Sequence, residues 1–150
     1  MKRSRTLKRK TKKYKKKGGA NSMEVRYPRF TVNNNETTEN STKNKPIISL
    51  YQMPYSTLIM YDPDAPSGTY LHYLVINVPS GNINSGDTIV SYAPPTPPPG
   101  SGTHRYIFEQ LQQSSPFTFA EPERSNFDIN NFKQQNGLAL KATKQFRVTT

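Results

Sequence analysis

One segment of this chain, the run LHYLVINV at Leu71–Val78, constrains its fold more than any other. It is almost continuously apolar, as expected of a central strand that is buried on both faces. A helical bundle is disfavoured, because the 150 residues include 13 prolines and 8 glycines. We therefore expect a mostly β domain that is built around Leu71–Val78.

Shorter strands are predicted on both sides of this run. They combine β-forming residues with flanking turn residues, and they are Glu24–Val32, Pro46–Tyr51, Ser56–Tyr61, Thr103–Leu111 and Phe146–Val148. The segment Pro94–Gly102 must be a loop, since proline lacks the N–H group that a sheet needs. One helix is predicted over Asn126–Gln135, with Ser125 or Asn126 as its cap and Gly137 as its stop.

Positive charge is concentrated at the N-terminus. The first 20 residues contain 11 of the 21 Lys and Arg residues and no acid, so the other 10 basic residues are balanced by the 10 acidic ones. Like charges at this density repel one another, and little apolar surface is present to be buried. We predict a disordered polybasic tail over residues 1–22 and one folded domain over residues 23–150.

The tail has three interpretations, and the sequence leaves them open. It is a solubilising extension, a nuclear-import address, or a contact with the phosphates of nucleic acid or of an anionic lipid surface. Binding of the last kind releases counterions, so it weakens steeply as salt is added. The residues expected to make such contacts are Lys8, Arg9, Lys10, Lys12, Lys13, Lys15, Lys16 and Lys17.

The composition also excludes several classes of protein. Without cysteine there is no disulfide framework, no thiolate nucleophile and no cysteine zinc site. No apolar stretch approaches the roughly 20 residues of a membrane span, and the basic N-terminus lacks the apolar core of a signal peptide. We expect an intracellular, cytoplasmic protein without a cofactor or metal, with the nucleus or a virion as alternatives because of the basic tail.

The two histidines are the residues from which a site can be built. His72 lies in the apolar run, and His104 lies two residues before Tyr106 on a predicted strand, so His104 and Tyr106 share a face. The turn Asp62-Pro63-Asp64 ends the strand that precedes His72. If these strands pair, two imidazoles, a phenol and carboxylates converge at one edge. A histidine on a strand more often only completes a core, and that interpretation stays open.

Three kinds of chemistry lack their usual motif here. No HxH or HExxH spacing supports a metal site, no GxSxG elbow supports serine hydrolysis, and Gly100-Ser101-Gly102 is too short for a phosphate loop. Imidazole and phenol donors beside a Gly/Pro loop instead suit a pocket for a small anion. A buried aspartate in such a pocket would hold an imidazole in one tautomer and favour its charged form.

In their order and residue types, these motifs resemble the two signature regions of the phosphatidylethanolamine-binding protein family, which includes Raf kinase inhibitor protein. The matching segments are DPDAP at 62–66, HYLVIN at 72–77, Pro97-Pro98 and GTHRYIF at 102–108. The resemblance implies a β-sandwich around a large antiparallel sheet, with one or two short helices and a cavity for phosphate or a phosphoethanolamine-type headgroup. It implies ligand-binding roles for Asp62, His72, Pro98, His104 and Tyr106, and places in the pocket wall for Ala65, Pro66, Tyr70, Thr96 and Pro97.

Several features depart from the family pattern. Thr96 replaces a usual glycine, Ser67–Tyr70 is short, the chain ends soon after the last predicted strand, and the basic tail is added. This short, tailed form resembles versions found in large DNA viruses. We therefore expect a shallower and more open cavity. Arg105 matches a structural arginine, and we expect it to point away from the cavity and to pair with Asp64.

The resemblance favours a non-enzymatic binding and regulatory protein that takes a phosphate-bearing small molecule or phospholipid headgroup and acts on an unidentified protein partner. One alternative is a tail-driven protein that binds nucleic acid or an anionic surface and carries a vestigial pocket. Another is a phosphatase or hydrolase with His104 as its base, which we disfavour because no activated nucleophile is evident.

Overall fold

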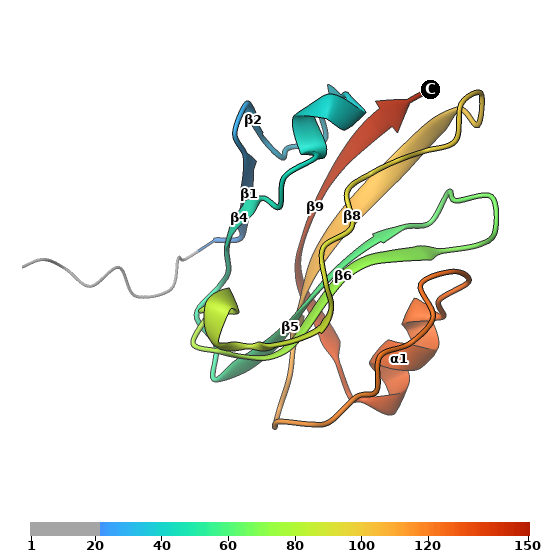
Figure 1. Ribbon diagram of the computed structural model, residues 1–150. Helices are drawn as coiled ribbons and strands as arrows, with labels where there is room; N and C mark the ends of the chain where they lie inside the picture. Colours follow the sequence, from blue (N-terminus) through green and yellow to red (C-terminus); the bar gives the residue numbers. More distant parts are fainter. Residues whose placement is uncertain (1–21) are drawn as a thin grey trace, which may run out of the picture.

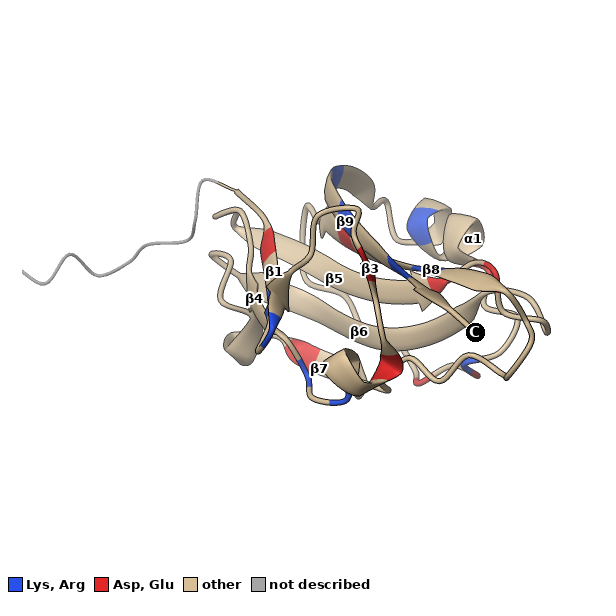
Figure 2. Cartoon of the chain, turned by 90° about the horizontal axis from the view of Figure 1, so that it is seen from above, with Lys and Arg blue, Asp and Glu red and all other residues tan. Residues whose placement is uncertain are grey.

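The computed structural model describes residues 22–150, and its chain path is shown in Figure 1. The predicted tail therefore lies outside the described residues, except for Ser22. Ten basic and ten acidic residues remain in the described part, and Figure 2 shows both signs distributed over the body.

Two β-sheets form the body, which confirms the mostly β prediction. The small sheet has the order β2-β1-β4, with β1 (Glu24–Tyr27), β2 (Phe30–Thr31) and β4 (Ile47–Ser49). The large sheet has the order β3-β9-β8-β5-β6-β7, with β3 (Glu36–Thr37), β5 (Tyr55–Asp62), β6 (Tyr70–Pro79), β7 (Asp87–Val90), β8 (Thr103–Gln112) and β9 (Ala139–Thr149). Its pairs are antiparallel except for the short β3, which runs parallel to β9 and makes the sheet mixed.

Strand β6 contains the apolar run and is buried on both faces, as predicted. Tyr73 and Val75 belong to the core between the two sheets, whereas Leu74 and Ile76 belong to a second core on the other face. Helix α1 (Ile129–Gln135) covers that second core through Phe132, which is only 3% exposed. The large sheet is thus the middle layer, with the small sheet on one face and α1 on the other (Figure 1).

Three boundary predictions were wrong. The predicted strand Glu24–Val32 is two antiparallel strands, β1 and β2, separated by a turn at residues 28–29. The helix begins three residues later than predicted, because Asp128 caps it by accepting a hydrogen bond from Asn131 N at 2.9 Å, and Asn126 has a positive φ of 53°. Strand β9 is much longer than the predicted Phe146–Val148, because its first half is mostly exposed and lacks a run of buried apolar residues. Two short 3₁₀ turns, η1 (Glu39–Thr42) and η2 (Ile83–Ser85), lie between the strands.

Candidate functional site

The candidate site lies where three strands of the large sheet meet the Pro94–Gly102 loop. Asp62 is the last residue of β5, and His104 and Tyr106 lie near the start of β8. His72 reaches the same place through a bulge in β6. Met60 pairs with Tyr73 and Tyr61 pairs with Leu71, so that His72 is an extra residue between two consecutive pairs. Bulges of this kind redirect a side chain and are frequent beside functional sites.

These residues surround one cavity of about 230 Å³. Its lining includes all ten residues that the sequence analysis assigned to a pocket: Asp62, Ala65, Pro66, Tyr70, His72, Thr96, Pro97, Pro98, His104 and Tyr106. Ser67 and Ser125 also line it, and no motif in the sequence pointed to them. The cavity is smaller than a typical site for a drug-sized ligand, so it suits a small group.

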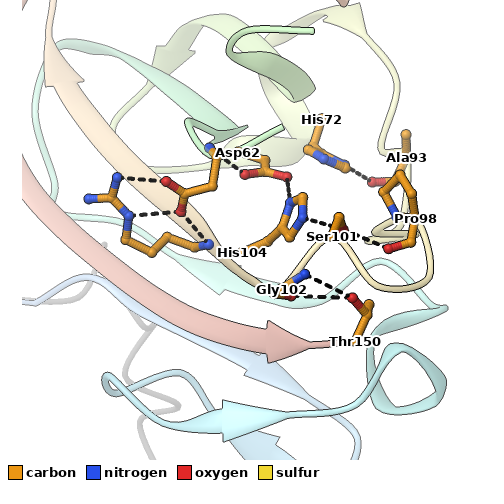
Figure 3. A network of polar contacts seen from close by, with 10 residues as sticks. Asp62, His72, Ala93, Pro98, Ser101, Gly102, His104 and Thr150 are labelled. Carbon is orange, nitrogen blue, oxygen red and sulfur yellow. Dashed lines mark hydrogen bonds and ion pairs between the residues drawn. The ribbon is translucent and has the colours of Figure 1, made fainter. Parts of the chain in front are cut away.

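A chain of short hydrogen bonds crosses the floor of this cavity (Figure 3). Asp62 Oδ2 lies 2.6 Å from His104 Nδ1, and His104 Nε2 lies 2.7 Å from Ser101 Oγ. The Ser101 hydroxyl lies 2.6 Å from the carbonyl oxygen of Pro98. The other carboxylate oxygen of Asp62 accepts the backbone N–H of Asp64 at 2.8 Å.

The order Asp62–His104–Ser101 contains the atoms of a serine-hydrolase relay, but the hydrogens point the wrong way for catalysis. A carbonyl oxygen only accepts, so the single hydroxyl hydrogen of Ser101 is donated to Pro98. His104 Nδ1 faces Asp62, and His104 Nε2 faces the Ser101 oxygen whose hydrogen is donated to Pro98. The serine hydrogen is therefore bonded to a carbonyl oxygen and is not directed at the imidazole.

The loop that carries Ser101 is shaped by two glycines. Gly100 and Gly102 have φ values of 74° and 90°, a left-handed conformation that side chains other than glycine rarely adopt. The base of the loop is held to the end of β9, where Thr150 N donates to Gly102 O at 3.1 Å and Gly102 N donates to Thr150 Oγ1 at 3.2 Å (Figure 3). Ser101 is thereby held beside His104.

His72 is held by two bonds to one residue of the facing loop. Its Nδ1 donates to Ala93 O at 2.7 Å, and its own backbone oxygen accepts from Ala93 N at 2.8 Å. Burial lowers the pKa of His72, although the contact with Ala93 and the charge of Asp62 oppose that shift. His72 is therefore neutral at pH 7, with its hydrogen on Nδ1 and the lone pair of Nε2 unpartnered within residues 22–150.

Tyr106 supplies a second polar atom without a protein partner among residues 22–150, its phenol oxygen. Its ring is 1% exposed, stacks on Phe146 at 5.2 Å between centroids, and meets the His72 ring edge-on at 5.3 Å. Burial raises the pKa of Tyr106, and the charge of Asp62 raises it further. The phenol consequently stays protonated, and its O–H finds no acceptor in the described part of the chain, which leaves it available to a ligand.

Arg105 lies outside the cavity and pairs with Asp64, as the sequence analysis expected. Asp64 accepts from Arg105 Nε and from its backbone N–H, both at 2.9 Å, and from its second guanidinium nitrogen at the same distance. These bonds lower the pKa of Asp64. The pair fixes the turn after β5 to the start of β8, and it therefore holds Asp62 and His104 next to each other.

Sequence reasoning missed three residues that hold the site. Ser101 was considered only as part of a phosphate loop, and Ala93 carried no signal at all. Arg124 donates to the backbone oxygens of Leu71, His72 and Ser91, at 3.2, 3.1 and 2.8 Å, and so fixes Ser125 at the rim of the cavity. Ala93 acts through its backbone, Arg124 bonds the backbone oxygens of other residues, and Ser101 is positioned by the shape of its loop. Residue types do not reveal contacts of this kind.

Residues 22–150 contain no group of three or more His, Asp or Glu side chains arranged to hold a metal ion. Within the same residues, no helix has the length and apolar character required to cross a bilayer.

Comparison with solved structures supports the fold. A carboxypeptidase Y inhibitor, solved in complex with its cognate proteinase, superposes with a TM-score of 0.74 at 20% identity, over 85% of this chain and 82% of the inhibitor. A phosphatidylethanolamine-binding protein from Plasmodium vivax superposes with a TM-score of 0.67 at 21% identity, over 84% of this chain and 83% of that protein.

Comparison of sequences assigns the family. A 26 kDa secreted antigen of Toxocara canis is 35% identical over 120 residues, which is 69% of this chain and 46% of the antigen. The chain spans about half the length of the curated relatives that it matches. The family model for phosphatidylethanolamine-binding protein matches residues 4–146. The chain therefore belongs to the phosphatidylethanolamine-binding protein family.

Proposed function

We propose that this chain is a non-enzymatic binding protein whose cavity holds a small anionic group, either phosphate or the phosphate of a phosphoethanolamine-type headgroup. The observation that carries the proposal is the phenol O–H of Tyr106, which lines the cavity, has no acceptor in the described residues and is accessible from the cavity. A protonated donor on a buried ring that opens into a cavity is placed to bind a ligand that accepts.

The charges around the cavity are compatible with an anion. Asp62 would repel one if it were alone, but both of its carboxylate oxygens are engaged, one by Asp64 N and one by His104 Nδ1. The acid Asp64 is likewise paired with Arg105. An incoming anion therefore meets carboxylates whose oxygens are already hydrogen-bonded.

His72 couples anion binding to a proton. In the free protein its Nε2 carries a lone pair, which an anion cannot use. An anion beside Nε2 favours the imidazolium, and the protonated ring would then donate to the ligand. Binding of an anion that does not itself titrate is therefore accompanied by proton uptake at His72.

Isothermal titration calorimetry with orthophosphate, sulfate and O-phosphoethanolamine tests the proposal. Tyr106→Phe removes the free donor and nothing else, and we expect it to weaken all three about tenfold, as is usual for a hydrogen bond to a charged group. Tyr55→Phe, at the start of β5 and away from the cavity, is the matched control. Binding that Tyr106→Phe leaves unchanged, or no binding to the wild type, would contradict a ligand role for this cavity.

The basic N-terminal segment supports a second, separate proposal. With 11 basic residues and no acid among its first 20, the chain binds nucleic acid or another polyanion through this segment, in the cytoplasm or in a nucleus or virion. Retention on a heparin column should then fall with salt and disappear when residues 2–17 are deleted. Retention that survives the deletion would refute this proposal.

A further inference from the structure

The molecule contains a second cavity that shares no lining residue with the first. It has a volume of about 240 Å³ and lies where the start of β4, strand β6 and the turn η2 meet. Ile48 and Ile83 form its apolar wall, Tyr73 closes its inner side, and Lys45, Ile47 and Asn84 stand at its rim.

Tyr73 is the first sign that this cavity is a binding site. Its side chain is buried, with 4% of the residue exposed, and its ring meets the Tyr92 ring edge-on at 5.9 Å. Burial raises the pKa of Tyr73, so its hydroxyl stays protonated. Neighbouring tyrosines have protein partners, since Tyr27 and Tyr92 bond each other at 2.7 Å and Tyr92 donates to Thr42 O at 2.8 Å. The Tyr73 hydroxyl has no such partner within residues 22–150, and its oxygen is accessible to a ligand in the cavity.

The chemistry of the rim indicates the class of ligand. Lys45 is the charged residue of the lining, and its Nζ lies 5.9 Å from the centre of the Tyr73 ring. The lining contains no acid, while the Asn84 amide adds a further polar group. A negatively charged head with hydrogen-bond acceptors complements these groups, and the ammonium attracts it across a partly desolvated cavity.

The apolar part of the cavity indicates what the ligand carries behind its head. Ile47 is 66% exposed, which makes it the most exposed large apolar side chain of the described residues. It stands beside the buried Ile48 and the half-buried Ile83, so an apolar ligand body would cover continuous apolar surface here. A volume of about 240 Å³ limits that body to a short chain or a single ring.

We propose that this second cavity binds a small amphipathic carboxylic acid, with its carboxylate at Lys45 and the Tyr73 hydroxyl and its apolar body against Ile47, Ile48 and Ile83. The site is independent of the anion cavity, because the two linings have no residue in common. This second cavity selects ligands that carry an apolar body, because inorganic phosphate or sulfate would leave its apolar wall exposed.

Three probes of equal chain length test this assignment: hexanoate, hexanol and hexylamine, titrated into ¹⁵N-labelled protein and followed by backbone amide shifts. We expect hexanoate to shift the backbone amides of Lys45, Ile47, Ile48, Tyr73, Ile83 and Asn84, hexanol to shift them more weakly, and hexylamine to leave them unmoved. Lys45→Ala should weaken hexanoate about three- to fivefold, the usual scale of a partly exposed ion pair, without changing hexanol. Lys43→Ala removes the same charge two residues away, outside the lining, and should change neither.

Three results would overturn the proposal. Hexanoate shifts that map to residues 62, 104 and 106 would place it in the first cavity. If the Lys45→Ala variant binds hexanoate and hexanol as tightly as the wild type does, the charge of Lys45 has no role in binding. Absence of saturable shifts up to the solubility limit of hexanoate would refute the site itself. Phosphate binding measured on the same samples reports on the anion cavity separately.

Discussion

Replacing Asp62 by asparagine should destabilise the protein strongly, although the two side chains have the same shape. Both carboxylate oxygens accept a hydrogen bond, one from Asp64 N at 2.8 Å and one from His104 Nδ1 at 2.6 Å. An amide offers one oxygen and one NH₂ group, so it keeps the bond from Asp64 N only when its NH₂ group faces His104 Nδ1 in place of the wild-type carboxylate oxygen. Asp62 and His104 are 3% and 1% exposed, so water cannot repair the mismatch.

The size of the effect follows from two contributions. One lost hydrogen bond contributes about 1 kcal/mol, and a buried donor left unsatisfied contributes about 1 to 3 kcal/mol more. The variant also removes the carboxylate from the buried Asp62–His104 contact, and breaking a buried ion pair outright costs about 3 to 5 kcal/mol. Because the imidazole can present a lone pair to the new NH₂ group, we expect a smaller net loss of about 1 to 3 kcal/mol.

Urea denaturation, followed by tyrosine fluorescence, measures this loss as a decrease of about 1 to 2 M in the midpoint. Asp128→Asn is the matched control, because asparagine caps a helix as well as aspartate does, and it should stay within about 0.5 kcal/mol of wild type. An Asp62→Asn variant as stable as that control would refute the hydrogen-bond count. NMR of ¹⁵N-labelled protein gives a second check, since the Asp64 amide that bonds Asp62 should shift in the Asp62→Asn variant.

Three further predictions concern other parts of the structure. Because His72 is neutral in the free protein, the affinity for sulfate measured by calorimetry should rise as the pH falls from about 8 to about 5, by at most about tenfold per pH unit. The His72→Gln variant should lose most of this pH dependence. Lys133→Met removes the ammonium 2.7 Å from the buried Glu109, so thermal denaturation at neutral pH should show a decrease of about 2 to 3 kcal/mol in the free energy of unfolding. The decrease should be smaller at acid pH, and an equal decrease at both pH values would contradict the ion-pair explanation. A fluorophosphonate probe should leave Ser101 unlabelled in intact-mass spectra, since the Ser101 hydroxyl donates its hydrogen to Pro98 O. Labelling that disappears in Ser101→Ala would refute that hydrogen-bond direction.

The parts of the fold that sequence could predict are those that carry a strong local pattern. Strand β6 was predicted because an apolar run of that length has few other solutions, and the loop before β8 was predicted because its prolines cannot pair. Strand periodicity and the turn at Asp62 suggested that Asp62, His72, His104 and Tyr106 converge, and motif resemblance added the other six cavity residues. The pairing of Arg105 with Asp64 was expected on the same grounds and is confirmed.

What sequence could not predict depends on distant pairing. The parallel contact of β3 with β9 involves two residues of each strand, which is too short to leave a pattern. The bulge at His72 follows from the register between β5 and β6, and residue types alone do not set it. The direction of the hydrogens between His104, Ser101 and Pro98 depends on a loop geometry that two glycines create. The second cavity brings together segments that carry no distinctive pattern of their own.

The bulge in β6 means that the large sheet does not require His72 for its own continuity. Met60–Tyr73 and Tyr61–Leu71 are already successive rungs, so a chain from which residue 72 had been deleted could join them directly into a regular ladder, at the expense of the bonds to Ala93. The large sheet accommodates His72 as one extra residue in β6. A one-residue deletion, more cleanly than any substitution, would separate the architecture of this protein from its chemistry.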